Sequence, residues 1–199
     1  MAAGDLCELD DVKAADNLAT DTFDDLIRRW ITAASTAIRG FAGREFAATA
    51  PNPQTRTFDV GPWARDREVP VGDLADDPTA VTVIDSEGVL VYTVTVATEV
   101  VALPLVREPE EPITSLRLRS AVPLAPSHQL TVAGEWGFPA VPADVTEACV
   151  EAVKEWLGPV KAVTRSGEEL DDSASGAVSR ALPNRSRMLL RPYRVPVVG

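Results

Sequence analysis

Residues 21–41 read DTFDDLIRRWITAASTAIRGF and carry the clearest helix pattern of the chain. Asp21 or Thr22 can cap the start of a helix here, and Gly40 or Gly43 can end it. The apolar residues recur at three- and four-residue intervals, which is the spacing of one helical face. We therefore predict an amphipathic helix over this stretch, with one face formed by Phe23, Leu26, Ile27, Trp30, Ile31, Ala34, Ile38 and Phe41.

A second amphipathic pattern lies near the other end of the chain. Pro142 suits the first turn of a helix, and Gly158-Pro159 is expected to stop it. The two helices each have an apolar face that needs a partner, so we expect them to pack together. A shorter helix is expected before the first one, from about Asp10 to Asn17. The apolar face of the second helix consists of Val145, Ala148, Cys149, Ala152, Val153 and Trp156.

Between the helices, from Arg56 to Glu135, the apolar period falls towards two, which is typical of β-strands. Residues 85–88 read DSEG and indicate a hairpin turn, and residues 107–112 (REPEEP) indicate a solvated loop. Strands are predicted at Ala80–Ile84, Val89–Val96, Thr98–Leu103, Ser115–Arg119 and Gln129–Ala133.

The expected fold class is therefore α+β: an amphipathic helical core formed by N- and C-terminal helices, an inserted antiparallel β-rich subdomain, and an extended C-terminal tail. The expected segments are 1–50, 51–135 and 136–199. Within the last one we predict a mobile loop over 164–177, a short helix over 183–190 and an extended tail from 191. The residues expected in the core or at the junction of the subdomains are Phe23, Ile27, Trp30, Trp136 and Trp156.

The composition limits the function. The 199 residues are 45% hydrophobic, enough for a core, and the net charge of −11 argues against general nucleic-acid binding, which depends on Lys and Arg. The charge is uneven: the start is acidic, whereas 173–199 contains five arginines and no acid. No apolar run has 18 residues and the acidic start lacks a signal-peptide pattern, so we expect no membrane contact and no secretion. Cys7 and Cys149 lie in no metal or redox motif, so reduced thiols are expected.

No pattern of catalytic residues is visible. His128 is the single histidine, and no nucleophile or carboxylate motif is spaced to work with it. Phosphate-binding and dinucleotide-binding glycine motifs are absent, and the paired acids lack the spacing of an EF-hand loop. The sequence thus predicts a protein that is not an enzyme, with no catalytic residue, metal site or cofactor.

Three blocks of sequence resemble the adaptor (head completion) family of the head-to-tail connector in tailed bacteriophages. Residues 12–46 match its short helix, long helix and Gly-Arg-aromatic ending, here Gly43-Arg44-Glu45-Phe46. Residues 131–157 (TVAGEWGFPAVPADVTEACVEAVKEWL) match the entry into its second core helix, and residues 182–194 (LPNRSRMLLRPYR) match its C-terminus. Smaller family members have little between the helices, so the β-rich insertion lies outside the resemblance.

The resemblance implies a structural virion protein that binds the portal as a ring, commonly of twelve copies, and is assembled in the cytoplasm of the bacterial host. A stopper or tail-terminator protein would follow below it, and genomic DNA would pass through the lumen without specific binding. Acidic residues lining the lumen would repel the DNA. The tail residues expected to bind the portal or a neighbouring subunit are Arg187, Arg191, Tyr193 and Arg194.

Two other functions remain open at this point. The chain could be a tail terminator or stopper of the same assembly, although such proteins are built mainly from strands. It could instead be a β-sandwich module that binds a ligand or a host surface, which an exposed aromatic cluster around Trp63 and Tyr92 would favour.

Overall fold

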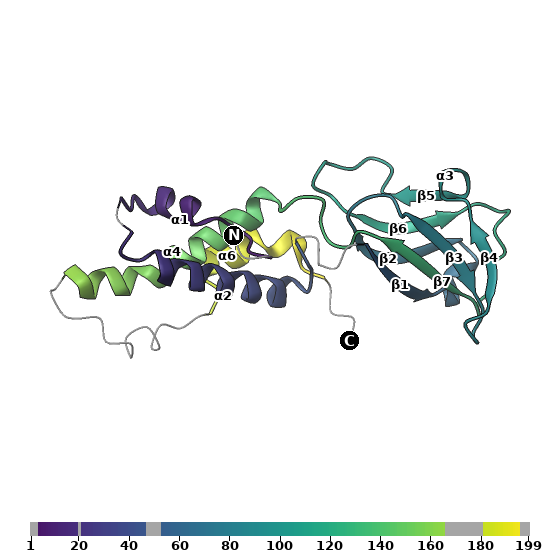
Figure 1. The fold of residues 1–199 in the computed structure, drawn as a ribbon, viewed down its shortest axis with the longest axis horizontal. Helices are drawn as coiled ribbons and strands as arrows, with labels where there is room; N and C mark the ends of the chain where they lie inside the picture. The colour runs from purple at the N-terminus through teal and green to yellow at the C-terminus, as the bar shows by residue number, and fades with distance from the viewer. Residues whose placement is uncertain (1–3, 20, 47–52, 166–180, 196–199) are drawn as a thin grey trace. The chain divides into compact units, whose positions relative to one another are not determined.

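The computed structural model describes residues 4–19, 21–46, 53–165 and 181–195, with the backbone alone for 161–165. The chain divides into two compact units (Figure 1). The helical unit contains the chain up to Phe46 and again from Val141, and the β unit contains residues 47–140. The β-rich region is therefore an insertion into a helical unit, and the predicted α+β class is confirmed. Residues 136–140, which we expected with the C-terminal helix, belong to the β unit.

The helical unit contains α1 (Leu9–Asp16), α2 (Asp24–Ala42), α4 (Ala143–Arg165) and α6 (Asn184–Leu189). Helix α4 packs against α1, α2 and α6, so the two amphipathic helices pack together as predicted. Their faces meet at Trp30 and Trp156, whose rings lie edge to face with centroids 6.5 Å apart. Such aromatic pairs stabilise a core by about 0.5–1.5 kcal/mol beyond their burial.

The predicted cap of α2 is wrong. The N-cap residue is Phe23, which makes no side-chain cap hydrogen bond, and Asp21 and Thr22 lie in the turn before it. The carboxylates of Asp21 and Asp24 instead accept hydrogen bonds from the Lys13 ammonium, at 2.7 and 2.9 Å. An acid that pairs with a cation on α1 is not free to cap α2, so the turn is held by the ion pair.

The ends of the two long helices follow different rules. Helix α2 ends at Gly43, one of the two glycines predicted to end it, and the left-handed φ of 69° there favours glycine. The predicted stop at Gly158-Pro159 is wrong, because α4 continues through Pro159 to Arg165. An internal proline costs a helix about 3 kcal/mol. Leu157 and Val160 are buried on either side of it, and burial of about 1.5–3 kcal/mol for each such side chain offsets that cost.

Within residues 53–140, strands form two antiparallel sheets, β1-β7-β3-β4 and β2-β6-β5. One apolar core contains residues from both sheets, including Leu116, Leu130 and Trp136, so the sheets form a sandwich. The strands are β1 (Gln54–Asp59), β2 (Glu68–Leu74), β3 (Ala80–Ile84), β4 (Leu90–Val94), β5 (Val100–Leu103), β6 (Ile113–Leu118) and β7 (Gln129–Gly134), with a short helix α3 (Val96–Glu99) and a 3-10 turn η1 (Gly61–Ala64).

The predicted strands are present, and β3 has the predicted bounds. Strand β4 is shorter than the predicted strand Val89–Val96. The short helix α3 (Val96–Glu99) lies where that predicted strand ends and the next one begins. Strands β1 and β2 had no bounds in our prediction. Strand β1 lies at an edge of its sheet and is mostly exposed, so it lacks an alternating pattern. Pro70 and Gly72 interrupt the pattern of β2.

The predicted short helix is confirmed as α6, but the predicted extended tail is wrong over Arg191–Tyr193, which forms the 3-10 turn η2. The segment does not extend away because Leu190 is fully buried and holds the chain against the helical unit. Beyond η2, the Val195 N–H donates to the Ala42 carbonyl at 2.9 Å. Residues 196–199 and most of the predicted mobile loop over 164–177 lie outside the described residues.

Candidate assembly surface

Helix α6 is fixed to α4 along one face. The buried Ser186 hydroxyl donates to the Ala148 carbonyl of α4 at 2.9 Å, in an environment where an unmade hydrogen bond would be costly. Next to it, the Arg185 guanidinium lies 3.8 Å from a carboxylate oxygen of Glu147 and 3.6 Å from one of Glu151. These contacts fix which side of α6 faces the core, and hence which side faces outward.

The outward side of this segment is basic and apolar at once. Arg187 and Arg191 are exposed, and Met188 between them is 74% exposed. Arginine and methionine are enriched in protein–protein interfaces. A large exposed apolar side chain flanked by two cations is the composition expected of a surface that binds an acidic or mixed protein surface.

Tyr193 and Arg194, the other two predicted tail residues, lie against the end of α2. The Tyr193 ring packs edge to face on Phe46, with centroids 5.6 Å apart. The Arg194 guanidinium lies 5.5 Å from the centre of the Phe41 ring. Both side chains therefore pack on the helical unit of their own chain. These contacts hold the end of η2 against the helical unit, two residues after Arg191 in the sequence.

The predicted core residues divide between the two units. Ile27, Trp30 and Trp156 are buried in the helical unit, and Phe23 is half-buried at the start of α2. Trp136 is fully buried in the sandwich core of the β unit, where its indole N–H donates to the Gln54 carbonyl at 2.9 Å.

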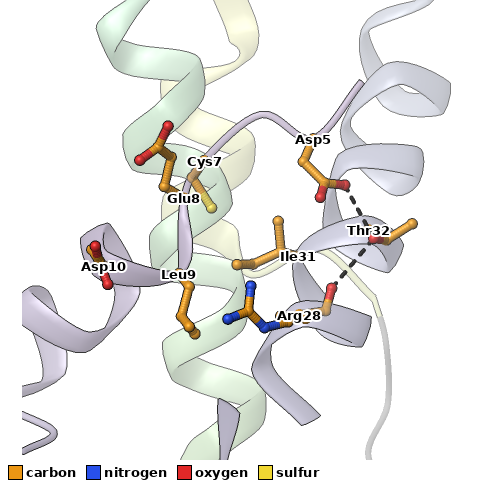
Figure 2. A pocket seen from close by; sticks show the side chains of 8 residues that line it. All are labelled: Asp5, Cys7, Glu8, Leu9, Asp10, Arg28, Ile31 and Thr32. Atoms are coloured by element: carbon orange, nitrogen blue, oxygen red, sulfur yellow. Dashed lines mark hydrogen bonds between the residues drawn. The ribbon is translucent and has the colours of Figure 1, made fainter. Parts of the chain in front are cut away.

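A pocket of about 320 Å³ opens in the helical unit (Figure 2). The segment before α1 and the first turn of α1 line one side, and Arg28, Ile31 and Thr32 of α2 line the other. The Thr32 hydroxyl lies 3.1 Å from an Asp5 carboxylate oxygen, which ties the segment to α2. The acids that line the pocket do not form a group suited to a metal ion, and the described part of the chain holds no such group.

A second hollow, of about 440 Å³, lies in the β unit. The loop predicted to be solvated lines it through Arg107, Glu108 and Glu111, opposite Asp76 and Glu135. With four acids to one arginine, this hollow is electronegative and disfavours phosphate-bearing ligands.

The single histidine has a structural position. The His128 Nδ1 accepts a hydrogen bond from the Ala125 N–H at 3.2 Å, which closes the turn before β7. Tyr92 is half-buried, packs against the sandwich core and donates to Glu99 at 2.8 Å, so it is not part of an exposed cluster around Trp63. Trp63 is 44% exposed.

One contact was missed entirely by our reading of the sequence. The Sγ atoms of Cys7 and Cys149 lie 3.1 Å apart in the interior of the helical unit, although the residues are 142 positions apart in the sequence. Neither residue has a neighbouring motif that could indicate the other, because the packing of the segment before α1 on α4 creates the pair.

Comparison with known proteins finds similar chains among solved structures. No protein-family model matches the chain, and no curated protein matches it. Among solved structures, a chain from the neck of an empty GTA (gene transfer agent) particle, computed with C6 symmetry, is 16% identical with a TM-score of 0.56. The match covers 100% of this chain and 95% of the other.

A chain from the neck of a native GTA particle, computed with C12 symmetry, is also 16% identical, with a TM-score of 0.41 over 94% of this chain and 90% of the other. At such identity the first match shows a shared fold, both units included. It agrees with the resemblance in the sequence blocks. Within the described residues, no helix is long and apolar enough to span a membrane.

Proposed function

We propose that this chain is a structural neck protein of a tailed-phage-like particle, the adaptor that binds the portal as a ring. The observation that carries the proposal is the fold match to a neck protein over the whole chain, including the β unit that the sequence resemblance left out. The proposed location is the virion neck after assembly in the host cytoplasm, and the proposed role is structural, with no catalysis.

The charges of the helical unit suit a ring. Closing a ring requires one face of a subunit to meet a different face of the next. The segment before α2 is acidic and α6–η2 is basic, so one unit carries both charges. We propose that Arg187 and Arg191, with Met188 between them, bind the portal or the adjacent subunit, and that Tyr193 and Arg194 position them.

The test is electron microscopy and co-sedimentation of the chain with its cognate portal. Wild type should stack on the portal as a ring, commonly of twelve copies. The double variant Arg187→Glu/Arg191→Glu should lose at least about tenfold in affinity, because two central interface cations become anions. The matched control is Arg65→Glu/Arg119→Glu, which makes the same charge change on exposed residues of the β unit and should bind as wild type does.

Charge reversal is a sharper test than deleting residues 190–199. The deletion would remove Leu190 and Tyr193, which pack on the helical unit, and would confuse unfolding with lost binding. Unchanged portal binding by the Arg187→Glu/Arg191→Glu variant would sink the assignment of this surface. A chain that binds no portal at all would overturn the adaptor assignment itself.

The same experiment separates the adaptor from a stopper or tail terminator. An adaptor binds portal directly, whereas a stopper binds only after an adaptor ring is in place. We further propose that acids line the lumen and keep DNA from adhering during its passage. Screening limits their reach to about 8 Å at physiological salt, so a ring whose inner wall is neutral or basic would contradict this.

A further inference from the structure

Two thiols meet in the core of the helical unit. Cys7 precedes α1, Cys149 lies on α4, and both are buried, at 3% and 0% exposure. Their sulfur atoms are 3.1 Å apart, about 1 Å more than the length of a disulfide bond. These are the only two cysteines of the chain, so neither thiol has another partner within it.

The surroundings hold the two sulfur atoms together. The Leu6 N–H donates to the Ser35 hydroxyl of α2 at 3.0 Å, and the same hydroxyl oxygen lies 3.8 Å from the Cys149 sulfur. On the other side of Cys7, the Glu8 N–H donates to the Asp11 carboxylate at 2.8 Å, which fixes the start of α1. The segment that carries Cys7 is therefore hydrogen-bonded both before and after the thiol.

One of the two cysteines lines a pocket that opens to solvent. Cys7 lines the 320 Å³ pocket between the segment before α1 and helix α2, where its side chain lies beside Glu8 on the side toward Ile31 (Figure 2). Cys149 does not line this pocket. The pocket has room for a small oxidant such as hydrogen peroxide, and a small oxidant that enters it meets Cys7 first.

We infer that Cys7 and Cys149 are a site of oxidative modification, at which a peroxide converts the thiol pair into a disulfide between the segment before α1 and helix α4. The Cys7 sulfur attacks one peroxide oxygen, the O–O bond breaks, and a sulfenic acid and one water form. The Cys149 sulfur then attacks the Cys7 sulfur, the S–O bond breaks, and a second water leaves. Two thiols and one peroxide thus become one disulfide and two waters.

The surroundings of the two thiols determine the rate at which they oxidise. The hydrogen bond to Cys149 and burial raise the pKa of the Cys7 thiol, whereas the hydrogen bond from Cys7 lowers the pKa of the Cys149 thiol. Cys7, the thiol that lines the pocket, therefore holds its proton at neutral pH. Because the thiolate is the nucleophile, oxidation is slow at neutral pH and becomes faster as the pH rises. The pair thus stays reduced in a reducing cytosol and oxidises on prolonged exposure to peroxide outside it. This inference stands on the geometry of the thiols and is independent of the proposed role in the neck.

The experiment uses the full wild-type chain, reduced and then incubated with hydrogen peroxide. Samples are denatured, alkylated with N-ethylmaleimide and weighed as intact protein, and peptides are mapped without reduction. We expect loss of both alkylation sites, a Cys7–Cys149 crosslinked peptide and a monomer on a non-reducing gel, all reversed by dithiothreitol. The thermal midpoint should rise by about 5–15 °C, because the crosslink closes a loop of more than 100 residues.

Cys7→Ser and Cys149→Ser are the controls, and neither should gain thermal stability on peroxide treatment. Two alkylatable thiols in the wild type after prolonged oxidation at raised pH would overturn the inference, and so would disulfide-linked dimers or sulfinic acid as the main product. If a serine variant fails to fold, the mass and peptide map of the wild type still decide the question.

Discussion

Replacing Leu190 by alanine tests whether the C-terminal segment is part of the helical core. Leu190 follows α6 and is fully buried, so truncation leaves a cavity beneath the segment. Buried Leu→Ala changes cost about 2–5 kcal/mol, the sum of lost transfer free energy and the cavity. We expect the free energy of unfolding of the helical unit to fall by an amount in that range.

The assay is urea unfolding followed by the helical circular dichroism signal, which reports mainly on the helical unit. For slopes of about 1–3 kcal/mol per molar urea, a loss of about 2–5 kcal/mol lowers the midpoint by roughly 0.7–5 M. Met188→Ala is the matched control, because Met188 lies on the same helix but is 74% exposed. That variant should stay within about 0.5 kcal/mol of wild type.

The two variants should also differ in assembly. Met188→Ala keeps α6 in place and removes part of the proposed interface, so it should weaken portal binding without lowering stability. Leu190→Ala should weaken binding only in proportion to the fraction of chains in which α6 has left α4. A Leu190→Ala protein as stable as Met188→Ala would refute the docking of this segment on the core.

Two further predictions concern the rest of the molecule. Gly134→Ala should destabilise the β unit by about 1–3 kcal/mol in thermal unfolding, because a Cβ there would lie 2.7 Å from the Cδ1 of the fully buried Leu74. The control Gly40→Ala should be neutral or stabilising, because a Cβ at that position has nothing within 4 Å. Equal effects of the two substitutions on stability would contradict this reasoning. The Arg117 guanidinium lowers the pKa of Glu68, so the pair stabilises the fold above the ordinary pKa of 4.5 and loses that effect as pH falls through the lowered value. Glu68→Gln should therefore be less stable than wild type near neutral pH, by less than about 1 kcal/mol because both groups are partly exposed. This difference in stability should disappear in acid. A difference that stays constant with pH would show another cause.

The elements that the sequence predicted well are those whose pattern is local. Helix α2 has a continuous apolar face, so its extent follows from periodicity, and its end follows from the need for a left-handed residue at Gly43. Strand β3 alternates and is followed by turn residues, so its bounds are exact in the prediction. The presence of an insertion follows from the change in period after residue 56.

The features that were missed depend on partners distant in sequence. Helix α4 continues through Pro159 because Val160 finds a buried position, which no local propensity indicates. Tyr193 has a ring to pack on because Phe46 follows the end of α2, more than 140 residues earlier in the sequence. The sequence shows that the C-terminal stretch is basic. Only the structure shows that Arg187 and Arg191 are exposed whereas Tyr193 packs on the helical unit.

The way the chain leaves the helical unit and returns to it sets an order for folding during synthesis. Helices α1 and α2 leave the ribosome early, but α4, against which both pack, is completed only after the whole β unit has been made. The β unit is continuous in sequence, so its contacts are complete first. The apolar faces of α1 and α2 therefore lack their partner α4 while about 100 residues are translated. During that interval the nascent chain is a substrate for chaperones and is prone to aggregate, so slower translation through the insertion should lower the yield of native protein.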